Sequence, residues 1–191
     1  MNKKQKDIIT KIHDFVKKES KTFADDDVFS NHVLNVIKYS KILAKKYNAN
    51  MFVVVVAAYL HDIYHLQTHD HKIHEIEGAK FAKNYLKRFD IKEKEITLIC
   101  ACILNHRGSK DRPRISIEEK IVACADAMDH INRWTHMFYR KSRLKEYDGT
   151  IEWMRAKLER GWKKLELPEA RYMVKEKYLA AKLSLKNSKI L

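Results

Sequence analysis

The chain contains few of the residues that break helices or form tight turns. Only 4 of its 191 residues are glycine and 2 are proline, which leaves little material for the turns of an all-β protein. Lys, Glu, Leu, Ala and Ile, which favour helices, are plentiful. We therefore predict a nearly all-α fold. A chain of this length can bury one substantial core, and nothing in it requires a second domain.

Cysteines are also scarce, and their arrangement argues against two classes of protein. The three cysteines are Cys100, Cys102 and Cys124. An odd number does not suit a disulfide framework, and without a CxxC pair they do not suit a structural zinc site. The pattern predicts a protein of the reducing cytoplasm.

Long apolar runs of the membrane-spanning kind are lacking. The run MFVVVVAAYL at 51–60 is too short to span a bilayer and is followed by the polar residues His61 and Asp62. The apolar residues of positions 5–20 are spaced as one face of a helix and form no signal-peptide stretch. We expect no targeting segment and no membrane partner.

The charge balance is strongly positive, with a formal net charge of +14. Polyanions such as nucleotide phosphates, nucleic acids or an anionic membrane surface will therefore be attracted. A lysine-rich solvated exterior explains the charge equally well, because the lysines are not concentrated in one block. Charge alone does not select a partner.

Apolar residues at helical spacing predict most of the secondary structure. The predicted helices cover 5–20, 32–47, 50–63, 74–89 and 92–107, with one beginning after Ser116 and others beginning at Thr150 and Pro168. Four consecutive valines in 50–63 favour a strand, but the length of that apolar run favours a buried helix. Ser116 and Glu119 match a capping box. Residues 64–72 have no periodicity and are predicted to form a loop.

Residues that commonly bind metals occur in three separate stretches. His32 lies in the first turn of one predicted helix, His61 and Asp62 follow the apolar run, and Asp126 lies within ACADAMD. Only the folded bundle can bring them together, which places a metal between helices. Mixed imidazole and carboxylate ligands suit Mn²⁺, Fe²⁺, Co²⁺, Ni²⁺ or Zn²⁺ better than Ca²⁺, with Mg²⁺ as a replacement.

These three stretches resemble the HD-domain superfamily of metal-dependent phosphohydrolases over about residues 25–135. The resemblance implies a helical bundle core, with 136–191 as a C-terminal helical extension. It implies a divalent metal held by His32, His61, Asp62 and Asp126. Such a metal would activate water and neutralise charge on a phosphate, so the implied reaction is hydrolysis of a phosphoester or phosphoanhydride. Asp62 is also the candidate to orient the attacking water.

Further residues match parts of the same family. His74, with Gly78 and Ala79, resembles the His-x-x-x-Gly-Ala element of two-metal HD proteins, and His106 falls where such proteins carry paired histidines. His74 and His106 are therefore candidates for a second metal or a phosphate, although hydrogen bonding to the metal ligands is an equal alternative.

Two branches of the family are disfavoured. Asn105 replaces an imidazole and no GYP triplet follows, which disfavours cyclic dinucleotide phosphodiesterases. The residues after Asp62 lack the Glu-Asp pair of alarmone hydrolases. The remaining resemblance is to small, single-domain bacterial HD hydrolases that act on nucleotides and other small phosphorylated molecules.

Several further residues are candidates for catalysis or substrate binding. Glu77 and Asp129 are candidates for acid–base or orienting groups, and the alternative is an ordinary carboxylate on a helix surface. The candidates for a positive substrate rim are Arg107, Lys110, Arg112, Arg114 and Arg133. For the basic loop 107–114, a simply solvated role is the more common outcome. His65, His69 and His71 are expected in the loop, not among the ligands.

The resulting functional hypothesis is a metal-dependent phosphohydrolase that acts on nucleotides, of the nucleoside triphosphate pyrophosphohydrolase or nucleotidase type. One alternative is a phosphodiesterase that cleaves cyclic or oligonucleotide substrates. Another is a basic nucleic-acid-binding module with a structural metal, which ranks lower because no nucleic-acid motif is present. The aromatic-rich C-terminal residues could also supply a homodimer surface.

Overall fold

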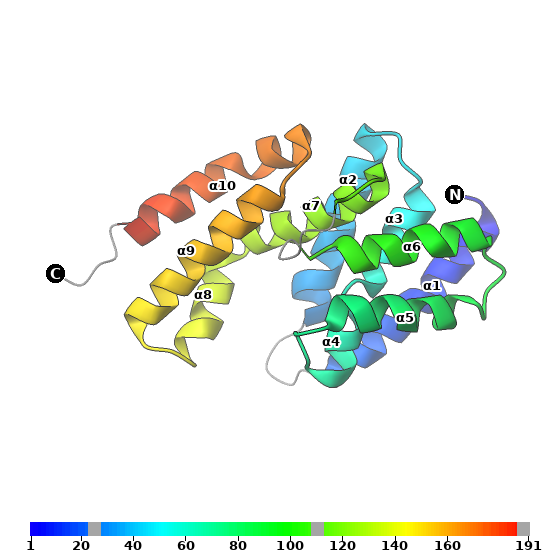
Figure 1. Ribbon diagram of the computed structural model, residues 1–191, viewed down its shortest axis with the longest axis horizontal. Coiled ribbons are helices and arrows are strands. Elements are labelled where there is room, and N and C mark those ends of the chain that lie inside the picture. Colours follow the sequence, from blue (N-terminus) through cyan, green and yellow to red (C-terminus); the bar gives the residue numbers. More distant parts are fainter. Residues whose placement is uncertain (23–27, 108–112, 187–191) are drawn as a thin grey trace.

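The fold is built from helices, as the composition predicts. The computed structural model describes residues 1–22, 28–107 and 113–186. Within these ranges every regular element is a helix (Figure 1). None of the helices found there has the length and apolar character needed to cross a membrane. The predicted all-α class is confirmed.

The helices form two parts that α7 joins. The elements are α1 (Lys3–Glu19), η1 (Ser20–Thr22), η2 (Phe29–Val33), α2 (Leu34–Lys46), α3 (Met51–Leu60), α4 (Ile63–Thr68), α5 (His74–Leu86), α6 (Glu93–Asn105), α7 (Ile117–Asn132), α8 (Trp134–Ser142), α9 (Tyr147–Lys164) and α10 (Pro168–Lys186). Helices α1 to α6 lie toward one end of α7, and α8 to α10 lie toward its other end (Figure 1).

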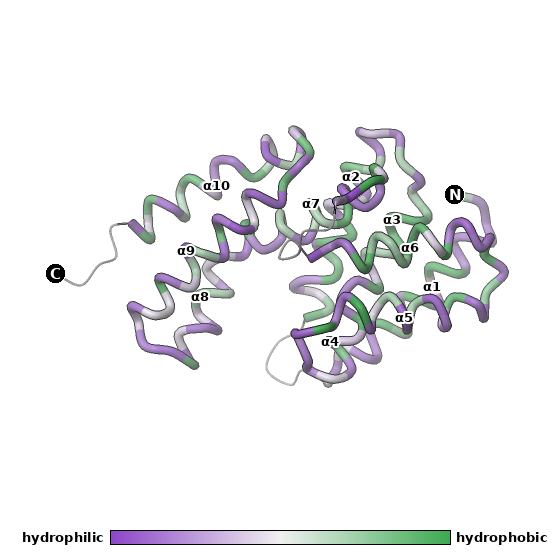
Figure 2. The backbone as a smooth tube through the Cα atoms, viewed as in Figure 1, coloured by the Kyte–Doolittle hydropathy of each residue, from purple (hydrophilic) through white to green (hydrophobic). Residues whose placement is uncertain are grey.

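The valine-rich segment forms the central helix α3, so the prediction of a helix there is confirmed. All residues from Phe52 to Leu60 are buried, because α1, α2, α6 and α7 pack around α3. In Figure 2, where green marks hydrophobic residues, α3 lies among the green parts of the tube. The Asn50 side chain accepts hydrogen bonds from the backbone N–H groups of Phe52 and Val53, which caps the helix. Burial on all sides outweighs the strand preference of valine.

Helix α7 carries most of its residues in the interior. It begins with the predicted capping box, in which Ser116 and Glu119 satisfy each other's backbone N–H groups. It packs against α2 and α6 and also against α9 and α10. Asp126 and Asp129 therefore lie where the bundle meets the C-terminal helices.

Two local predictions were wrong. Residues Ile63 to Thr68 form the short helix α4 and are not a loop; six residues are too few to display a helical period, but Ile63 and Leu66 are fully buried. Helix α9 begins at Tyr147, so Thr150 does not cap it. Thr150 is buried inside the first turns, where its hydroxyl donates to the Glu146 carbonyl oxygen at 3.0 Å.

Other boundaries agree with the predictions. Helix α10 begins at Pro168, which suits a residue that lacks a backbone N–H. The helix predicted from residue 32 is preceded by the π-helical turn η2, and His32 lies in that turn. Trp162 of α9 stacks on Tyr178 of α10 with ring centroids 4.2 Å apart, so this aromatic pair joins the two C-terminal helices.

Candidate metal centre

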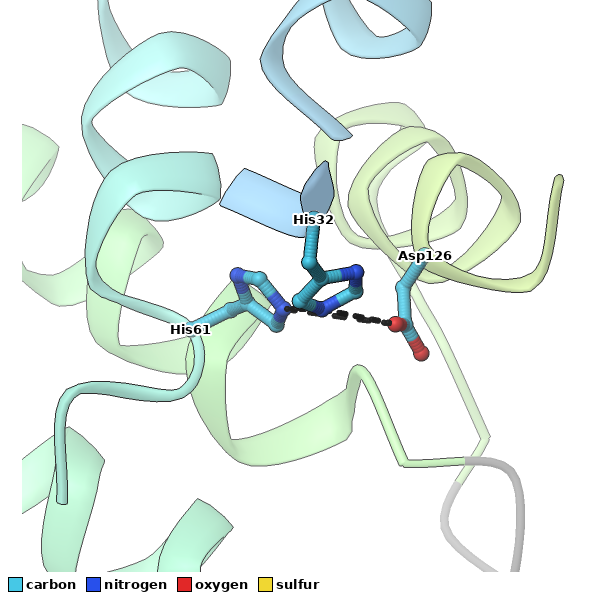
Figure 3. Close-up of side chains that lie close together, drawn as sticks. All are labelled: His32, His61 and Asp126. Carbon is cyan, nitrogen blue, oxygen red and sulfur yellow. Dashed lines mark hydrogen bonds and ion pairs between the residues drawn. The ribbon is translucent and has the colours of Figure 1, made fainter. Parts of the chain in front are cut away.

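Three of the predicted metal ligands meet between η2, the end of α3 and α7. His32 Nε2 lies 3.1 Å from His61 Nε2 and 3.6 Å from Asp126 Oδ1. His61 Nε2 lies 4.0 Å from the same carboxylate oxygen. Figure 3 shows the three side chains pointing toward one another. All three residues are buried, so their polar atoms face a small common space.

Asp62 completes this group of four. Its Oδ2 lies 3.4 Å from the Nε2 atoms of both His32 and His61. Ligands that are each about 2.0–2.2 Å from one transition metal lie about 3–4 Å apart, and the separations here fall in that range. Two imidazole nitrogens and two carboxylate oxygens make a donor set for a divalent transition metal. The residues present therefore fit such an ion.

The other oxygen of Asp62 faces a second pair of histidines. Asp62 Oδ1 lies 3.3 Å from His74 Nε2 and 3.5 Å from His106 Nε2. The two imidazole nitrogens are 3.3 Å apart. Asp62, His74 and His106 thus form a second group able to hold a metal, and one carboxylate lies between two histidine pairs.

The imidazoles of both groups are held with Nε2 inward by hydrogen bonds from Nδ1. In three of them Nδ1 donates to the backbone carbonyl oxygen three residues earlier: His61 to Ala58 (2.8 Å), His74 to His71 (3.0 Å) and His106 to Ile103 (2.6 Å). Such outer hydrogen bonds fix the tautomer and ring orientation of a histidine ligand. The arrangement prepares these nitrogens to bind a ligand at Nε2.

His32 is oriented by a carboxylate instead of a carbonyl. Its Nδ1 donates to Asp129 Oδ2 at 2.6 Å. Arg133 holds this carboxylate from the other side, with Nε at 3.0 and 2.9 Å from its two oxygens and Nη2 at 2.8 Å from Oδ2. Asp129 is fully buried behind the imidazole. The structure therefore places Asp129 as a positioning residue for His32, and no direct acid–base role follows from its location.

The electrostatics of the first group favour ionised carboxylates. Burial opposes protonation of His32, but hydrogen bonds with Asp129 and Asp62 outweigh it and raise the pKa of His32 to about 10. Burial would raise the pKa of Asp62 and of Asp126, yet the surrounding cationic groups hold the pKa of both carboxyls well below the usual range. A protonated His32 is thus one of the cations that balance these carboxylates, together with Lys164 at Asp126 and Arg133 at Asp129.

Two residues near Asp126 were not predicted from the sequence. Lys164 Nζ of α9 lies 2.5 Å from Asp126 Oδ2, and both side chains are less than a tenth exposed. The His130 ring stacks on the His32 ring at 5.4 Å, and its Nδ1 lies 3.6 Å from Asp126 Oδ1. His130 follows Asp126 by four residues, a helical spacing that could have been noticed. Lys164 is 38 residues from Asp126, and no local signal indicates the contact.

Two adjoining cavities open onto the site. The first has a volume of about 270 Å³, and we call it the cationic cavity because Arg107, Lys157, Arg160 and Lys164 line it. The second has a volume of about 450 Å³, and we call it the aromatic cavity because its lining includes Trp153 with Val28, Met137 and Leu144. Asp62, His71, His130 and Lys157 line both cavities. The candidate metal ligands lie where the cavities meet.

The predicted substrate residues have different surroundings. Arg107 lines the cationic cavity, and its Nη1 donates to the His71 and Lys72 carbonyl oxygens and to Glu75. Arg133 lines the aromatic cavity while bound to Asp129. Both positions are compatible with contact to a ligand.

Two other candidates lie outside the group of ligand residues. Arg114 is bound to the Asn105 carbonyl oxygen and to Glu166, where it ties the residues before α7 to those after α9. Glu77 forms a surface ion pair with Lys80 at 2.7 Å and lines neither cavity. The structure thus does not bring Glu77 to the site. The predicted substrate residues Lys110 and Arg112 lie outside the described residues.

Residues of the predicted 64–72 loop approach the site more closely than expected. His65 belongs to α4, and its ring stacks on that of His71 with centroids 3.4 Å apart. His69 ends α4 in a left-handed conformation with φ of 60°. His71 lines both cavities. This histidine-rich segment therefore forms one wall of the site.

Comparison with known proteins gives a consistent assignment. A family model for the HD domain matches residues 29–131. Similar solved structures include a Lactobacillus plantarum protein (TM-score 0.74, 19% identity, 97% of this chain and 95% of that chain covered). Another is Bacillus subtilis YpgQ in complex with ADP (TM-score 0.71, 21% identity, 96% of this chain and 94% of that chain covered). A third is a Bacillus thuringiensis HD-superfamily hydrolase (TM-score 0.71, 21% identity, 95% of both chains covered). No curated protein matches.

The matched region covers more than half of the chain and contains all four residues of the first group. The chain therefore belongs to the HD-domain family of metal-dependent phosphohydrolases, as the sequence resemblance predicts. The similar solved structures share less than a quarter of their residues with it, so they support the fold alone.

Proposed function

We propose that the protein hydrolyses phosphate bonds in nucleotides, as a nucleoside triphosphate pyrophosphohydrolase or a nucleotidase. The observation that carries this proposal is the position of Asp62 between two histidine pairs, at the edge of a cavity lined by Arg107, Lys157, Arg160 and Lys164. Cations beside a hydrolytic centre suit a substrate with several phosphate charges. The similar structure of YpgQ with ADP supports a nucleotide as ligand.

His32, His61, Asp62 and Asp126 would hold a divalent ion of the Mn²⁺, Fe²⁺, Co²⁺, Ni²⁺ or Zn²⁺ type. When bound, such an ion supplies a water of lowered pKa and neutralises charge that develops on the phosphate. Asp62, whose two oxygens face different histidine pairs, would orient the attacking water. Lys164, held at Asp126, would bind a phosphate oxygen at the edge of the cavity.

His74 and His106 offer two inward-facing nitrogens 3.3 Å apart. With Asp62 Oδ1 they would accept either a second divalent ion or, when protonated, a phosphate oxygen of the substrate. Burial lowers the pKa of His106, whereas for His74 the bond to Asp62 outweighs burial and raises the pKa. A neutral His106 beside a more basic His74 suits metal binding by the first and a phosphate contact by the second.

The proposal is tested with purified protein that is stripped by a chelator and then reloaded with Mn²⁺. Nucleoside mono-, di- and triphosphates, cyclic nucleotides and oligonucleotides are supplied as substrates, and the products are identified. We expect nucleotide hydrolysis that is lost on chelation and restored by the metal. Activity that survives chelation, or cleavage of cyclic or oligonucleotides only, would contradict the proposal.

A matched pair of variants tests the residue assignment. Asp62→Asn removes the carboxylate that faces both histidine pairs and should lower kcat by at least about 100-fold, a loss in the range expected when a catalytic group is removed. Asp148→Asn makes the same change at an exposed position of α9 and should leave kcat unchanged. Circular dichroism checks that both variants are folded.

A further inference from the structure

The two cavities differ in the chemistry of the walls that they do not share. Helix α9 presents Lys157, Arg160 and Lys164 to the cationic cavity, at spacings of three and four residues that place them on one helix face. Neither Lys157 nor Arg160 forms an ion pair with any residue that the structure describes. Ala127 and Gly161 are the two residues of this lining that have no polar side chain. Such a wall suits a chain of phosphates.

The aromatic cavity is larger and has an apolar side. Its volume of about 450 Å³ compares with about 270 Å³ for the cationic cavity. Trp153, Met137, Leu144 and Val28 contribute to its lining. Three further cations, Arg133, Arg140 and Lys141, also line it. Arg133 is bound to Asp129, and Lys141 Nζ lies 5.3 Å from the centre of the Trp153 ring. A wall that combines an indole and apolar side chains with polar groups suits a planar base and a ribose.

One helix thus supplies both kinds of wall. Trp153 and Lys157 are four residues apart on α9, and Lys157 is shared by the two cavities. The face of α9 that begins at Trp153 and ends at Lys164 therefore passes from the aromatic cavity, through the junction beside Asp62, to the cationic cavity. A ligand with an apolar ring at one end and several anionic groups at the other matches this order.

We propose that the aromatic cavity binds the nucleoside part of the substrate, with the base against Trp153, while Lys157, Arg160 and Lys164 bind the phosphate chain. This inference rests on the proposed function, because it names where the two halves of a nucleotide lie. It assigns substrate recognition to α9, outside the region that matches the HD family model. Stacking of one base on an aromatic side chain contributes roughly 5- to 100-fold to affinity.

Titration calorimetry on the Mn²⁺-loaded full chain tests the inference with two probes, a methylene-bridged nucleoside triphosphate analogue and inorganic tripolyphosphate. Trp153→Leu should weaken binding of the nucleoside analogue at least about 5-fold and leave tripolyphosphate binding unchanged. Arg160→Gln should weaken both probes. Equal affinity of the Trp153→Leu variant and the parent for the analogue, or equal weakening of both probes, would overturn the inference.

Control variants on the same helix separate local from general effects. Trp162→Phe alters an indole that lines neither cavity, and Lys163→Gln removes a charge from an exposed position of α9. Both should leave the affinity for each probe unchanged. A loss of analogue binding in these controls as large as that in Trp153→Leu would overturn the assignment to Trp153.

Fluorescence gives a readout that does not depend on a Trp153 substitution. In a Trp134→Phe and Trp162→Phe double variant, Trp153 is the remaining tryptophan. The nucleoside analogue should quench its emission and tripolyphosphate should not; absence of quenching at a saturating analogue concentration would contradict the inference. If the parent protein binds the analogue through Trp153 but hydrolyses no nucleotide, the proposed function is contradicted, whereas the assignment of the nucleoside site is retained.

Discussion

The Asp129 carboxylate accepts a hydrogen bond from His32, with Oδ2 2.6 Å from Nδ1. Because Arg133 fixes the same carboxylate, this hydrogen bond holds the imidazole with Nε2 facing the other candidate ligands. We predict that Asp129→Asn lowers the affinity for Mn²⁺ by about 10- to 100-fold, as expected when the outer partner of a histidine ligand is lost. Equilibrium dialysis measures the Kd. The exposed Asp148→Asn should bind like the parent, and a parent-like Kd in Asp129→Asn would refute the role.

Metal binding should release a proton from His32. Burial disfavours the protonated form, but Asp129 and Asp62 raise the pKa of His32 to about 10, so the imidazole is protonated at neutral pH and must lose that proton to bind a metal. We predict release of about one proton per ion at pH 7.5 and an affinity that rises with pH. Calorimetry in buffers of different ionisation enthalpy measures this number, and His32→Gln should abolish the release. Metal binding without release of a proton would contradict this role of His32.

The His32 imidazole should also make the metal-free fold sensitive to alkali. The pKa of His32 is raised from 6.5 in the unfolded chain to about 10 in the fold. The contribution of His32 to stability is therefore fully present below pH 6.5 and is lost as the pH rises through about 10. We expect the Tm of chelated protein to fall across this interval, and the fall to be smaller in His32→Gln. A Tm difference between parent and variant that is independent of pH would count against this linkage.

The apolar helix before the site should dominate the stability of the bundle. Leu60 is fully buried and directly precedes His61. We predict that Leu60→Ala lowers the free energy of unfolding by about 2–5 kcal/mol, because it leaves a cavity in a packed core. Leu183→Ala, at a position 62% exposed on α10, should change it by less than about 0.5 kcal/mol. Urea unfolding of chelated protein compares the two, and equal effects would show that α3 is not the core.

Much of the fold was predictable because its signals are local. The apolar run of α3, the capping box at Ser116 and the proline that opens α10 each act within a few residues. Helix α4 was missed because six residues show no period. Thr150 has the chemistry of a cap, but the residues before it continue the helix, and the sequence alone does not reveal this.

The site was predictable only in part. His32, His61, Asp62 and Asp126 were expected together from a family resemblance. The structure places the Nε2 atoms of the two histidines 3.1 Å apart, and each lies 3.4–4.0 Å from an oxygen of Asp62 and of Asp126. Glu77 and Asp129 are both helical carboxylates, and only tertiary packing distinguishes the surface residue from the buried partner of His32. The α9 cations reach the site through packing of α9 on α7, which no spacing along the chain encodes.

The account depends most on the claim that the two histidines and two carboxylates of the first group hold a divalent metal. Crystals of the protein grown with Mn²⁺ and measured near the manganese absorption edge test this claim directly. We predict an anomalous peak about 2.0–2.3 Å from the Nε2 atoms of His32 and His61 and from an oxygen of Asp62 and of Asp126. A map with no such peak at millimolar Mn²⁺, or with the ion bound elsewhere, would contradict the account.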